Sequence, residues 1–508
     1  MAGTSVQPHI QHCRNYSILR THYTRSLQMI HAIKNKLQPF LKIAIIAAIG
    51  LASAGLRPAE AQAPANHTVQ TYDVVVIGSE IQGMLLAKAA RDGGLKVLVI
   101  DPREQTGGEL LQGRMFYLDD VHDNAGRSLV QGEIKRLFRG YKKGRIRTTA
   151  DFTRYYTELT KGISVRSGTI LRSLDTRPGA QKNGRTLYAL TCKDPSGASY
   201  TLRARYWVDN TDFAALASRL GEPRIPGMES LYRGGYKPDY MAATYMLSFR
   251  QVHWEQLRQD VLSHYPLTNV RKKYGSNTYV DRSFATGFSF LTKGYRSTDP
   301  RLKLRGLNIV NQKNGIVSIN GLLIYDVDPS SAASVESAIQ CAQAEAPLIR
   351  DYLRGCLPGF AKAELHEAPP YLYIRDFNRY ATKYVLSETD VNQGAHFWDN
   401  VSLGGYPIDL QGTRAIPIGI GFGKPDRYGV PLRSFQLRSY DNVLVAGKNI
   451  GADIKAYGTA RIMPTTALAA QTIGIILARE QTPLDRLTPA DFVRIHRYLK
   501  AEYGIDVR

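Results

Sequence analysis

The clearest pattern of apolar and polar positions begins at residue 73. DVVVIG at 73–78 is an apolar, β-branched run, and IQGMLLAKAARDGG at 81–94 has the composition of a helix closed by two glycines. LKVLVID at 95–101 is a second apolar run. An apolar strand, a short turn, a helix and another apolar strand predict a buried parallel sheet of the α/β class.

The same patterns divide the rest of the chain. Strand-like runs occupy 163–174 and 188–211, and the turn DPSGA makes the second of them a hairpin. Residues 225–433 mix aromatic-rich strands with helices and are expected to form a separate, inserted α+β domain. NVLVAG at 442–447 is again a buried strand, followed by a helix with Pro464 in its first turn. The sheet domain is therefore expected to be split into residues 71–224 and 434–480, with a helical tail at 481–508.

The N-terminus has the pattern of an export signal. Three lysines precede an uncharged apolar run at 43–56, and small residues follow it. A retained membrane anchor is the alternative, but the run is shorter than the roughly 18 to 20 residues that span a bilayer. The expected segments are an upstream extension at 1–28 and a signal peptide at 29–63, cleaved after Ala61 or Ala63. The mature chain is then periplasmic or extracellular and has no membrane span.

The formal net charge of +22 favours anionic partners. The first 67 residues hold seven basic and one acidic residue, which leaves +16 for the rest. Acidic sugars, lipid headgroups, acidic electron carriers and nucleic acid all fit a basic surface, and charge alone does not choose among them. The basic run at 132–147 includes Phe138 and Tyr141, so it is interpreted as a solvated face or an anionic partner surface. Nucleic acid is the least expected partner of an exported protein.

Cysteine usage excludes two classes of site. Cys192, Cys341 and Cys356 follow the leader, and this odd number does not make a disulfide scaffold. Cys341 and Cys356 either pair or remain free thiols. Because no cysteine or histidine cluster has metal-ligand spacing, no metal is expected.

The turn GSEIQG at 78–83 has residues typical of a diphosphate-binding helix start. Gly78 and Gly83 stand at the first and third glycine positions, and Asp101 ends the next strand, where an acid binds a ribose. Glu80 replaces the middle glycine. Because a carboxylate repels a diphosphate, its side chain is expected to turn toward ribose hydroxyls, a basic residue or the far end of the pocket. The alternative is that Glu80 only caps the helix.

Several motifs, in order along the chain, resemble one family. They are VVVIGSEIQG followed by VLVIDPREQTGGEL, YWVDNTDFAALASRLG at 206–221, YIRDFNRYATKYVLSETDV at 373–391, LGGYPIDLQG at 403–412 and NVLVAGKNIGADIKAYGTARIMPT from 442. This set resembles the FAD-dependent oxidoreductase family, whose FAD-binding domain has the glutathione-reductase-type fold. The resemblance spans about residues 72–479. It implies a Rossmann-like FAD-binding domain, split along the chain, with a substrate domain at 225–433.

The resemblance also implies which residues bind FAD. They are Gly78, Ser79, Glu80, Gly83, Asp101, Arg103, Gly107, Gly108, Leu171, Asp209, Thr211, Gly447, Pro464 and Thr465. In the family pattern Asp101 holds the adenosine ribose, Leu171 frames the adenine, and Asp209 with Thr211 forms a second nucleotide-facing turn. The helix beginning at Pro464 directs backbone donors at the flavin pyrimidine oxygen, and a helix N-terminus stabilises the negative charge that gathers there on reduction.

FAD carries the electron chemistry, so the protein is expected to bind, orient and tune it. No second glycine fingerprint is present, so electrons are expected directly from a substrate or partner and not through a nicotinamide domain. The catalytic candidates are Arg375, Arg461, Asp409 and Tyr384, with Arg379, Asp390 and Tyr406 behind them. Guanidinium groups suit carboxylates and flavin carbonyls, and the acids and tyrosines suit proton transfer. Each of the three arginines is as readily a solvated or domain-contact residue, and Asp409 is as readily a structural cap.

Two departures from the family pattern limit what the resemblance implies. Lys448 stands where the family has an arginine, and Ile454 where a histidine is common. Losing that histidine removes a group that titrates near neutral pH, so a proton-transfer role of relatives is not expected to carry over.

The leading hypothesis is an exported FAD-dependent oxidoreductase that transfers a hydride between FAD and a small-molecule or sugar-like substrate. An acidic electron carrier or an anionic polymer is a further expected partner. The alternative is a polyanion-binding or processing protein in which FAD is structural. A cytoplasmic flavoprotein acting on tRNA is the third hypothesis.

Overall fold

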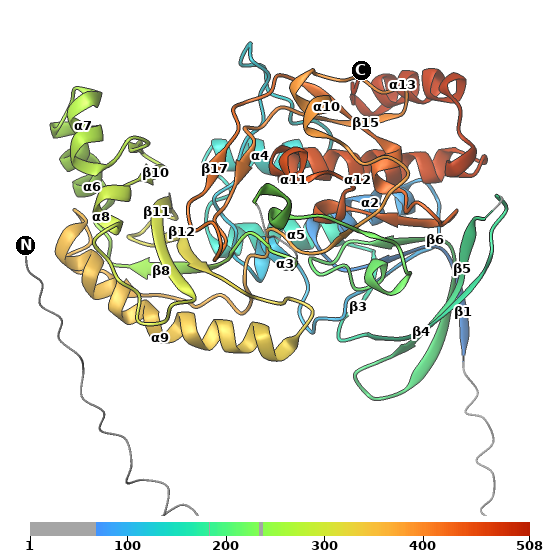
Figure 1. Cartoon of the computed structure of the whole chain (residues 1–508), viewed down its shortest axis with the longest axis horizontal. Coiled ribbons are helices and arrows are strands. Elements are labelled where there is room, and N and C mark those ends of the chain that lie inside the picture. Colours follow the sequence, from blue (N-terminus) through green and yellow to red (C-terminus); the bar gives the residue numbers. More distant parts are fainter. Residues whose placement is uncertain (1–67, 182, 233–236) are drawn as a thin grey trace, which may run out of the picture. The chain divides into compact units, whose positions relative to one another are not determined.

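The computed structural model describes residues 68–181, 183–232 and 237–508 (Figure 1). The predicted upstream extension and signal peptide lie outside these residues. The first sheet has strand order β3-β2-β1-β6-β5-β4, and β19 also pairs with β6. Its strands are β1 Val69–Ile77, β2 Val97–Ile100, β3 Ser164–Arg166, β4 Ile170–Pro178, β5 Arg185–Lys193, β6 Ser199–Asp209 and β19 Val443–Val445.

The register of this sheet brings distant segments to one edge. β1 runs parallel to both neighbours, so Ile77 lies opposite Ile100 of β2 and Asp209 of β6. β19 is also parallel to β6, with Val445 opposite Asp209. Carboxyl ends of parallel strands form the ligand edge of an α/β sheet. The residues that follow β1, β2, β6 and β19 therefore meet there, which confirms a Rossmann-like parallel sheet split along the chain.

Helices cover this sheet and are held by its apolar faces. α2, Ile81–Asp92, is buried along most of its length, and α12, Met463–Arg479, packs beside it (Figure 1). Gln82 of α2 donates to the Thr466 hydroxyl of α12 at 3.3 Å. This contact joins the returning C-terminal segment to the first β-α-β unit. The other helices on this part of the chain are α3 Gly108–Leu111, α4 Ile134–Lys142, α5 Thr149–Thr160, α10 Glu388–Asn392, α11 Ile454–Ala460 and α13 Pro489–Tyr503.

A second, antiparallel sheet has its own hydrophobic core. In spatial order its strands are β13 Glu364–Leu365, β8 Ala243–Arg250, β12 Val317–Ile324, β11 Leu302–Asn311, β10 Phe284–Gly287 and β9 Tyr279–Val280. Its helices are α6 Trp254–Ser263, α7 Leu267–Tyr274, α8 Ser289–Thr292 and the long α9 Ala332–Cys356, which packs on β8 and β12 (Figure 1). The sheet lies within the predicted inserted α+β domain. The described residues form one compact unit, so the boundaries at 225 and 433 remain a prediction.

Three two-stranded pairs complete the described strands. They are β7 Arg224–Ile225 with β14 Arg379–Tyr380, β15 Asn400–Gly404 with β18 Tyr428–Pro431, and β16 Asp409–Leu410 with β17 Ile420–Gly421.

The basic run at 132–147 includes the amphipathic helix α4, Ile134–Lys142. Phe138 and Tyr141 of α4 are buried in the main hydrophobic cluster, whereas the basic residues of this helix face solvent. The aromatic residues are therefore core side chains and not a stacking surface for bases. Cys192, Cys341 and Cys356 are free thiols. Within the described residues no single helix is long and apolar enough to cross a membrane, and α11 with α12 passes the same length and composition test only as a pair bent by 84°.

Candidate cofactor and substrate site

The turn after β1 brings the backbone very close to the turn after β6. Gly78 has φ +98°, and a Cβ atom there would lie 2.5 Å from the Asn210 carbonyl oxygen. Only glycine fits this position without strain. The N–H of Gly83, in the first turn of α2, donates to the Asn210 side-chain oxygen. The Asn210 side chain therefore accepts a hydrogen bond from one of the free N–H groups at the start of the helix. No sequence motif pointed to this residue.

Asp101 lies at the end of β2 as predicted, but both of its oxygens have partners within the chain. Oδ2 accepts from the Ser79 N–H at 2.7 Å and from the Ser79 hydroxyl, and Oδ1 accepts from the Arg103 N–H at 2.8 Å. Arg103 Nη2 also approaches Oδ2 at 3.0 Å. A ribose hydroxyl would share or replace the contacts of Arg103.

The Glu80 side chain turns toward a basic residue, one of the predicted alternatives. Its carboxylate accepts from Arg103 Nη1 at 2.8 Å and from the Glu109 N–H at 2.7 Å. Glu80 precedes α2 at the N-cap position but makes no side-chain capping bond, so the capping interpretation is wrong. A Cβ atom at Gly108, which has φ +41°, would overlap this carboxylate. Glu80 therefore fills the space that the double-glycine turn of Gly107 and Gly108 leaves open.

The turn after β6 corrects one expectation. Asp209 was expected to face the nucleotide, but its buried carboxylate closes on its own turn through the N–H groups of Thr211, Leu216 and Ala217. Thr211 donates its hydroxyl to Asp209 at 2.8 Å, so both side chains stabilise the turn instead. The buried carboxylate of Asp212, in the same turn, lies 3.6 Å from Arg103 Nη1. Burial raises the pKa of Asp212 to about 6, and Arg103 opposes this rise.

Lys448 forms a second buried pair in this pocket. Its ammonium group contacts Glu109 Oε2 at 2.9 Å and donates to the Ile374 carbonyl oxygen at 2.6 Å. Burial would lower the pKa of Lys448, but Glu109, Glu80 and Asp212 together hold it above its usual value. Lys448, which stands where the family has an arginine, therefore keeps a positive charge at this position. Its ion pair with Glu109 joins the returning segment to the turn around Gly108.

The residues of this pocket fit FAD after one local rearrangement. The buried hydroxyl of Thr465 at the start of α12 has no hydrogen-bond partner among the described residues, whereas the Asn210 carbonyl already packs against Gly78. Pro464 precedes Thr465 in α12, Gly447 lies in the short turn after β19, which contacts α12, and Leu171 lies partly buried on β4. Glu80 is the group that has to move, because its carboxylate fills the glycine cradle and repels phosphate.

Three arginines gather where the antiparallel sheet meets the returning segment. Arg375 donates to the Ala242 carbonyl oxygen and to the Thr244 hydroxyl, and it stacks over the Tyr373 ring at 4.8 Å. Arg461 contacts the Tyr373 hydroxyl at 3.4 Å and the Asp409 carbonyl oxygen at 3.2 Å. Burial, with Arg305 and Arg461 nearby, lowers the pKa of Arg375 to about 10. The structure thus brings together Arg375, Arg461 and Asp409 of the predicted catalytic set.

Tyr384, the fourth candidate, has other partners. Its hydroxyl donates to Asp390 at 2.8 Å, and Asp390 also forms the capping box of α10 with Ser387. Arg379 pairs with Asp376 and stacks over Tyr457. These contacts indicate structural roles for Tyr384, Asp390 and Arg379.

The cluster includes two residues that carried no sequence motif. Asp119 lines a small cavity with Arg461, and burial raises the pKa of its carboxyl to about 6 while nearby Tyr406 and Arg461 oppose the rise. Arg305 comes from β11 and contacts Asn320 at 2.9 Å. Neither residue belongs to a spacing pattern: Asp119 comes from the segment between α3 and α4, and Arg305 comes from the antiparallel sheet.

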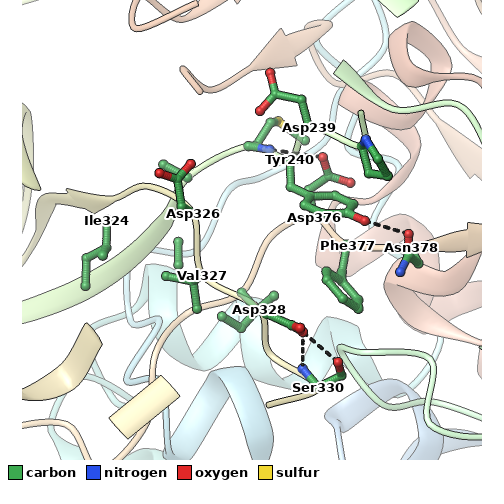
Figure 2. Close-up of a pocket in the computed structure, with 15 residues that line it drawn as sticks. Asp239, Tyr240, Ile324, Asp326, Val327, Asp328, Ser330, Asp376, Phe377 and Asn378 are labelled. Atoms are coloured by element: carbon green, nitrogen blue, oxygen red, sulfur yellow. Dashed lines mark hydrogen bonds between the residues drawn. The ribbon is translucent and has the colours of Figure 1, made fainter. Parts of the chain in front are cut away.

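A separate cavity of about 370 Å³ is lined by four aspartates (Figure 2). They are Asp239, Asp326, Asp328 and Asp376. Figure 2 shows Ser330 donating to Asp328, and Tyr240 donating to Asn378 at 2.7 Å. Each of the four carboxylates has a partner within the chain, so the cavity lacks an unpaired acid.

A family model described as FAD dependent oxidoreductase matches residues 73–485. No curated protein matches the chain. Among solved structures, a geranylgeranyl bacteriochlorophyll reductase-like protein from Thermoplasma acidophilum is 12% identical with a TM-score of 0.36, over 86% of this chain and 84% of that one. Anhydrotetracycline hydroxylase OxyS from Streptomyces rimosus is 12% identical with a TM-score of 0.37, over 86% and 67%. p-Nitrophenol 4-monooxygenase from Pseudomonas putida is 11% identical with a TM-score of 0.36, over 80% of each chain.

Likenesses this distant carry no argument about function. The family match, by contrast, covers most of the chain and includes both parts of the split sheet. The chain belongs to the FAD dependent oxidoreductase family and is an oxidoreductase whose cofactor is FAD.

Proposed function

We propose that the chain is an exported enzyme that transfers a hydride between a small-molecule substrate and FAD. The family match supports the cofactor and the reaction class. The signal-like pattern at 29–63 supports export.

Residues at the ligand edge of the first sheet would hold the cofactor. The turn at Gly78 and the start of α2 would receive the diphosphate, with Asp101 and Arg103 near the adenosine end. The start of α12, where the Thr465 hydroxyl has no partner in the described part of the chain, would face the flavin. FAD, when bound, supplies the two-electron acceptor of the reaction.

The observation that carries the proposal is the cluster of Arg461, Asp119 and Asp409 beside the start of α12. Asp119 and Arg461 line one cavity together with Glu109, Ile462 and Met463. The proton-handling groups therefore lie next to the start of α12, where the flavin would bind, which supports hydride transfer from a C–H donor. The exposed basic face of α4 supports an acidic electron carrier or an anionic polymer as a further partner.

Anaerobic reduction of the flavin tests the enzyme. Purified protein loaded with FAD is mixed with a panel of hydroxy acids, sugars, amines and alcohols, and the loss of flavin absorbance is followed. At least one donor is expected to bleach the flavin. A protein that binds FAD but resists every donor would support the structural-flavin alternative.

Export is tested by the mature N-terminus. Protein isolated from its native cells is expected to begin near Gln62 or Pro64. A chain that begins at Met1 or Met29 would contradict export.

A further inference from the structure

The ion pairs of the cofactor pocket join more acids than bases. Four buried carboxylates share two cations, and this acidic cluster consists of Glu80, Asp101, Glu109 and Asp212 with Arg103 and Lys448. With two positive and four negative groups ionised, its formal charge is −2. The edge of the sheet that would receive the diphosphate of FAD therefore carries an excess of negative charge.

Asp212 has the least satisfied carboxylate of this cluster. The residue is 4% exposed, and its buried Oδ2 has no hydrogen-bond partner among the described residues. This oxygen lies 3.6 Å from Arg103 Nη1, which already donates to Glu80 at 2.8 Å. Its Oδ1 lies 3.5 Å from the Tyr371 hydroxyl, a long hydrogen bond. Because an ionised carboxylate with an unpartnered oxygen is costly to bury, Asp212 gains from binding a proton.

The surroundings of Asp212 act on its charge in both directions. The charged and titratable groups that face it are Arg103, Glu80, Lys448, Asp101 and Tyr371. Burial raises the pKa of Asp212 to about 6; Arg103 and Lys448 oppose the rise, whereas Glu80 and Asp101 add to it. Without a ligand, Asp212 is therefore mostly ionised at neutral pH and takes up a proton in slightly acidic solution.

A diphosphate would shift this balance toward the protonated form. Arg103 Nη1 serves both Glu80 and Asp212, so an anion that replaced Glu80 at this nitrogen would lie beside Asp212. Like charges repel strongly at short range where water is excluded. A proton on Asp212 removes one of these charges. Binding of the anion and binding of the proton therefore favour each other, and the coupling is reciprocal.

We propose that Asp212 takes up a proton when the chain binds FAD, so that loading of the cofactor is linked to pH. The inference rests on the proposed function for the place of the diphosphate. Tyr371 and Arg103 line a cavity of about 820 Å³ together with Phe213, and the Tyr371 hydroxyl gives a proton access from this cavity to Asp212. Because the free chain loses this proton as the pH rises through about 6, FAD binds more weakly above that pH.

Calorimetry in two buffers counts the protons that enter with FAD. The apoprotein is titrated with FAD near about pH 7 in PIPES and in imidazole, which release a proton with different heats. FAD does not titrate near this pH, because its diphosphate stays ionised and its ring N–H stays protonated. The wild type is expected to take up about 0.5 to 1 proton per FAD, and Asp212→Asn close to none. Glu104→Gln, at an exposed acid that lines the same cavity as Arg103, is the matched control and should keep the wild-type value.

The dissociation constant of FAD gives a second readout of the same linkage. It should be about five- to tenfold higher at about pH 8 than at about pH 6 in the wild type, and nearly constant in Asp212→Asn. FAD binding without proton uptake in the wild type, or with equal uptake in Asp212→Asn, would overturn the linkage and leave the cofactor site standing. A wild-type chain that binds no FAD at any pH between about 5 and 8 would overturn the proposed function, and the linkage with it. The proton count of the wild type needs no variant, so it decides the linkage even if Asp212→Asn misfolds.

Discussion

Replacing Glu80 with glutamine should strengthen FAD binding. The Glu80 carboxylate fills the Gly108 cradle and holds both Arg103 and the Glu109 N–H. A diphosphate that enters has to displace it, or lie beside it as a like charge. Glu80→Gln removes the charge with little change of shape and leaves Arg103 available to the phosphate.

The magnitude follows from the charges. A unit charge about 5 Å from another interacts by about 3 kcal/mol at an effective dielectric constant of about 20. Rotation of the side chain and screening reduce this value, so the expected gain is about 1.4 to 2.8 kcal/mol, or about ten- to a hundredfold in Kd. Glu80→Gly, which also clears the cradle, should bind FAD at least as tightly as Glu80→Gln.

Equilibrium dialysis of the apoprotein against FAD measures the effect. Glu104→Gln is the matched control, because Glu104 is an exposed acid close to Arg103 and its loss should change Kd by less than about twofold. The difference between wild type and Glu80→Gln should shrink as salt is added. A Kd that is unchanged or weaker in Glu80→Gln would refute the competition between this carboxylate and the diphosphate.

Three further variants test the buried charges. Because Asp212 has a folded pKa of about 6, the native state retains a proton that the unfolded state has lost between about pH 4 and 6, so stability falls as pH rises through this range. In urea unfolding, Asp212→Asn should therefore have the same free energy of unfolding as the wild type near about pH 4. Near about pH 8 its free energy of unfolding should be about 1 to 2 kcal/mol higher. An equal difference at both pH values would contradict this. Lys448→Met leaves Glu109 without its cation and should cost about 3 to 5 kcal/mol in urea unfolding, with partial recovery when Glu109→Gln is added; a single variant as stable as wild type would disprove the pairing. Arg375→Ala removes the bond to Thr244 and should lower stability by about 3 kcal/mol, whereas an unchanged midpoint with altered substrate kinetics would indicate a catalytic role.

The sequence was sufficient to predict the parts of the fold that depend on local pattern. The apolar runs of β1 and β19 each occupy a buried parallel position because their β-branched residues suit no exposed strand. The glycine at 78 and the acid at 101 follow β1 and β2, so their place at the ligand edge follows from strand order. A basic residue was one of three predicted surroundings of the Glu80 side chain. Sequence spacing alone does not tell which neighbour a side chain contacts.

The remaining features of the site depend on three-dimensional packing. Asp209 occupies its predicted turn, but the side chain closes on backbone N–H groups instead of facing a ligand, and a motif does not encode that choice. Lys448 and Glu109 are 339 residues apart and meet only through the returning segment. Asp119, from the segment between α3 and α4, and Arg305, from β11, come near each other only in the folded chain. The sequence motifs therefore located the cofactor edge, and the structure supplied the contacts of the side chains around it.

The most direct test of the account is the flavin content of the full-length protein after reconstitution and desalting. Purified wild type and Glu80→Gln are saturated with FAD, separated from free flavin, and examined by absorption and by flavin release on denaturation. The account predicts one FAD per chain in both proteins, with slower loss of flavin from Glu80→Gln on dialysis. Colourless protein from both, after saturation, would contradict the assignment of this pocket to FAD.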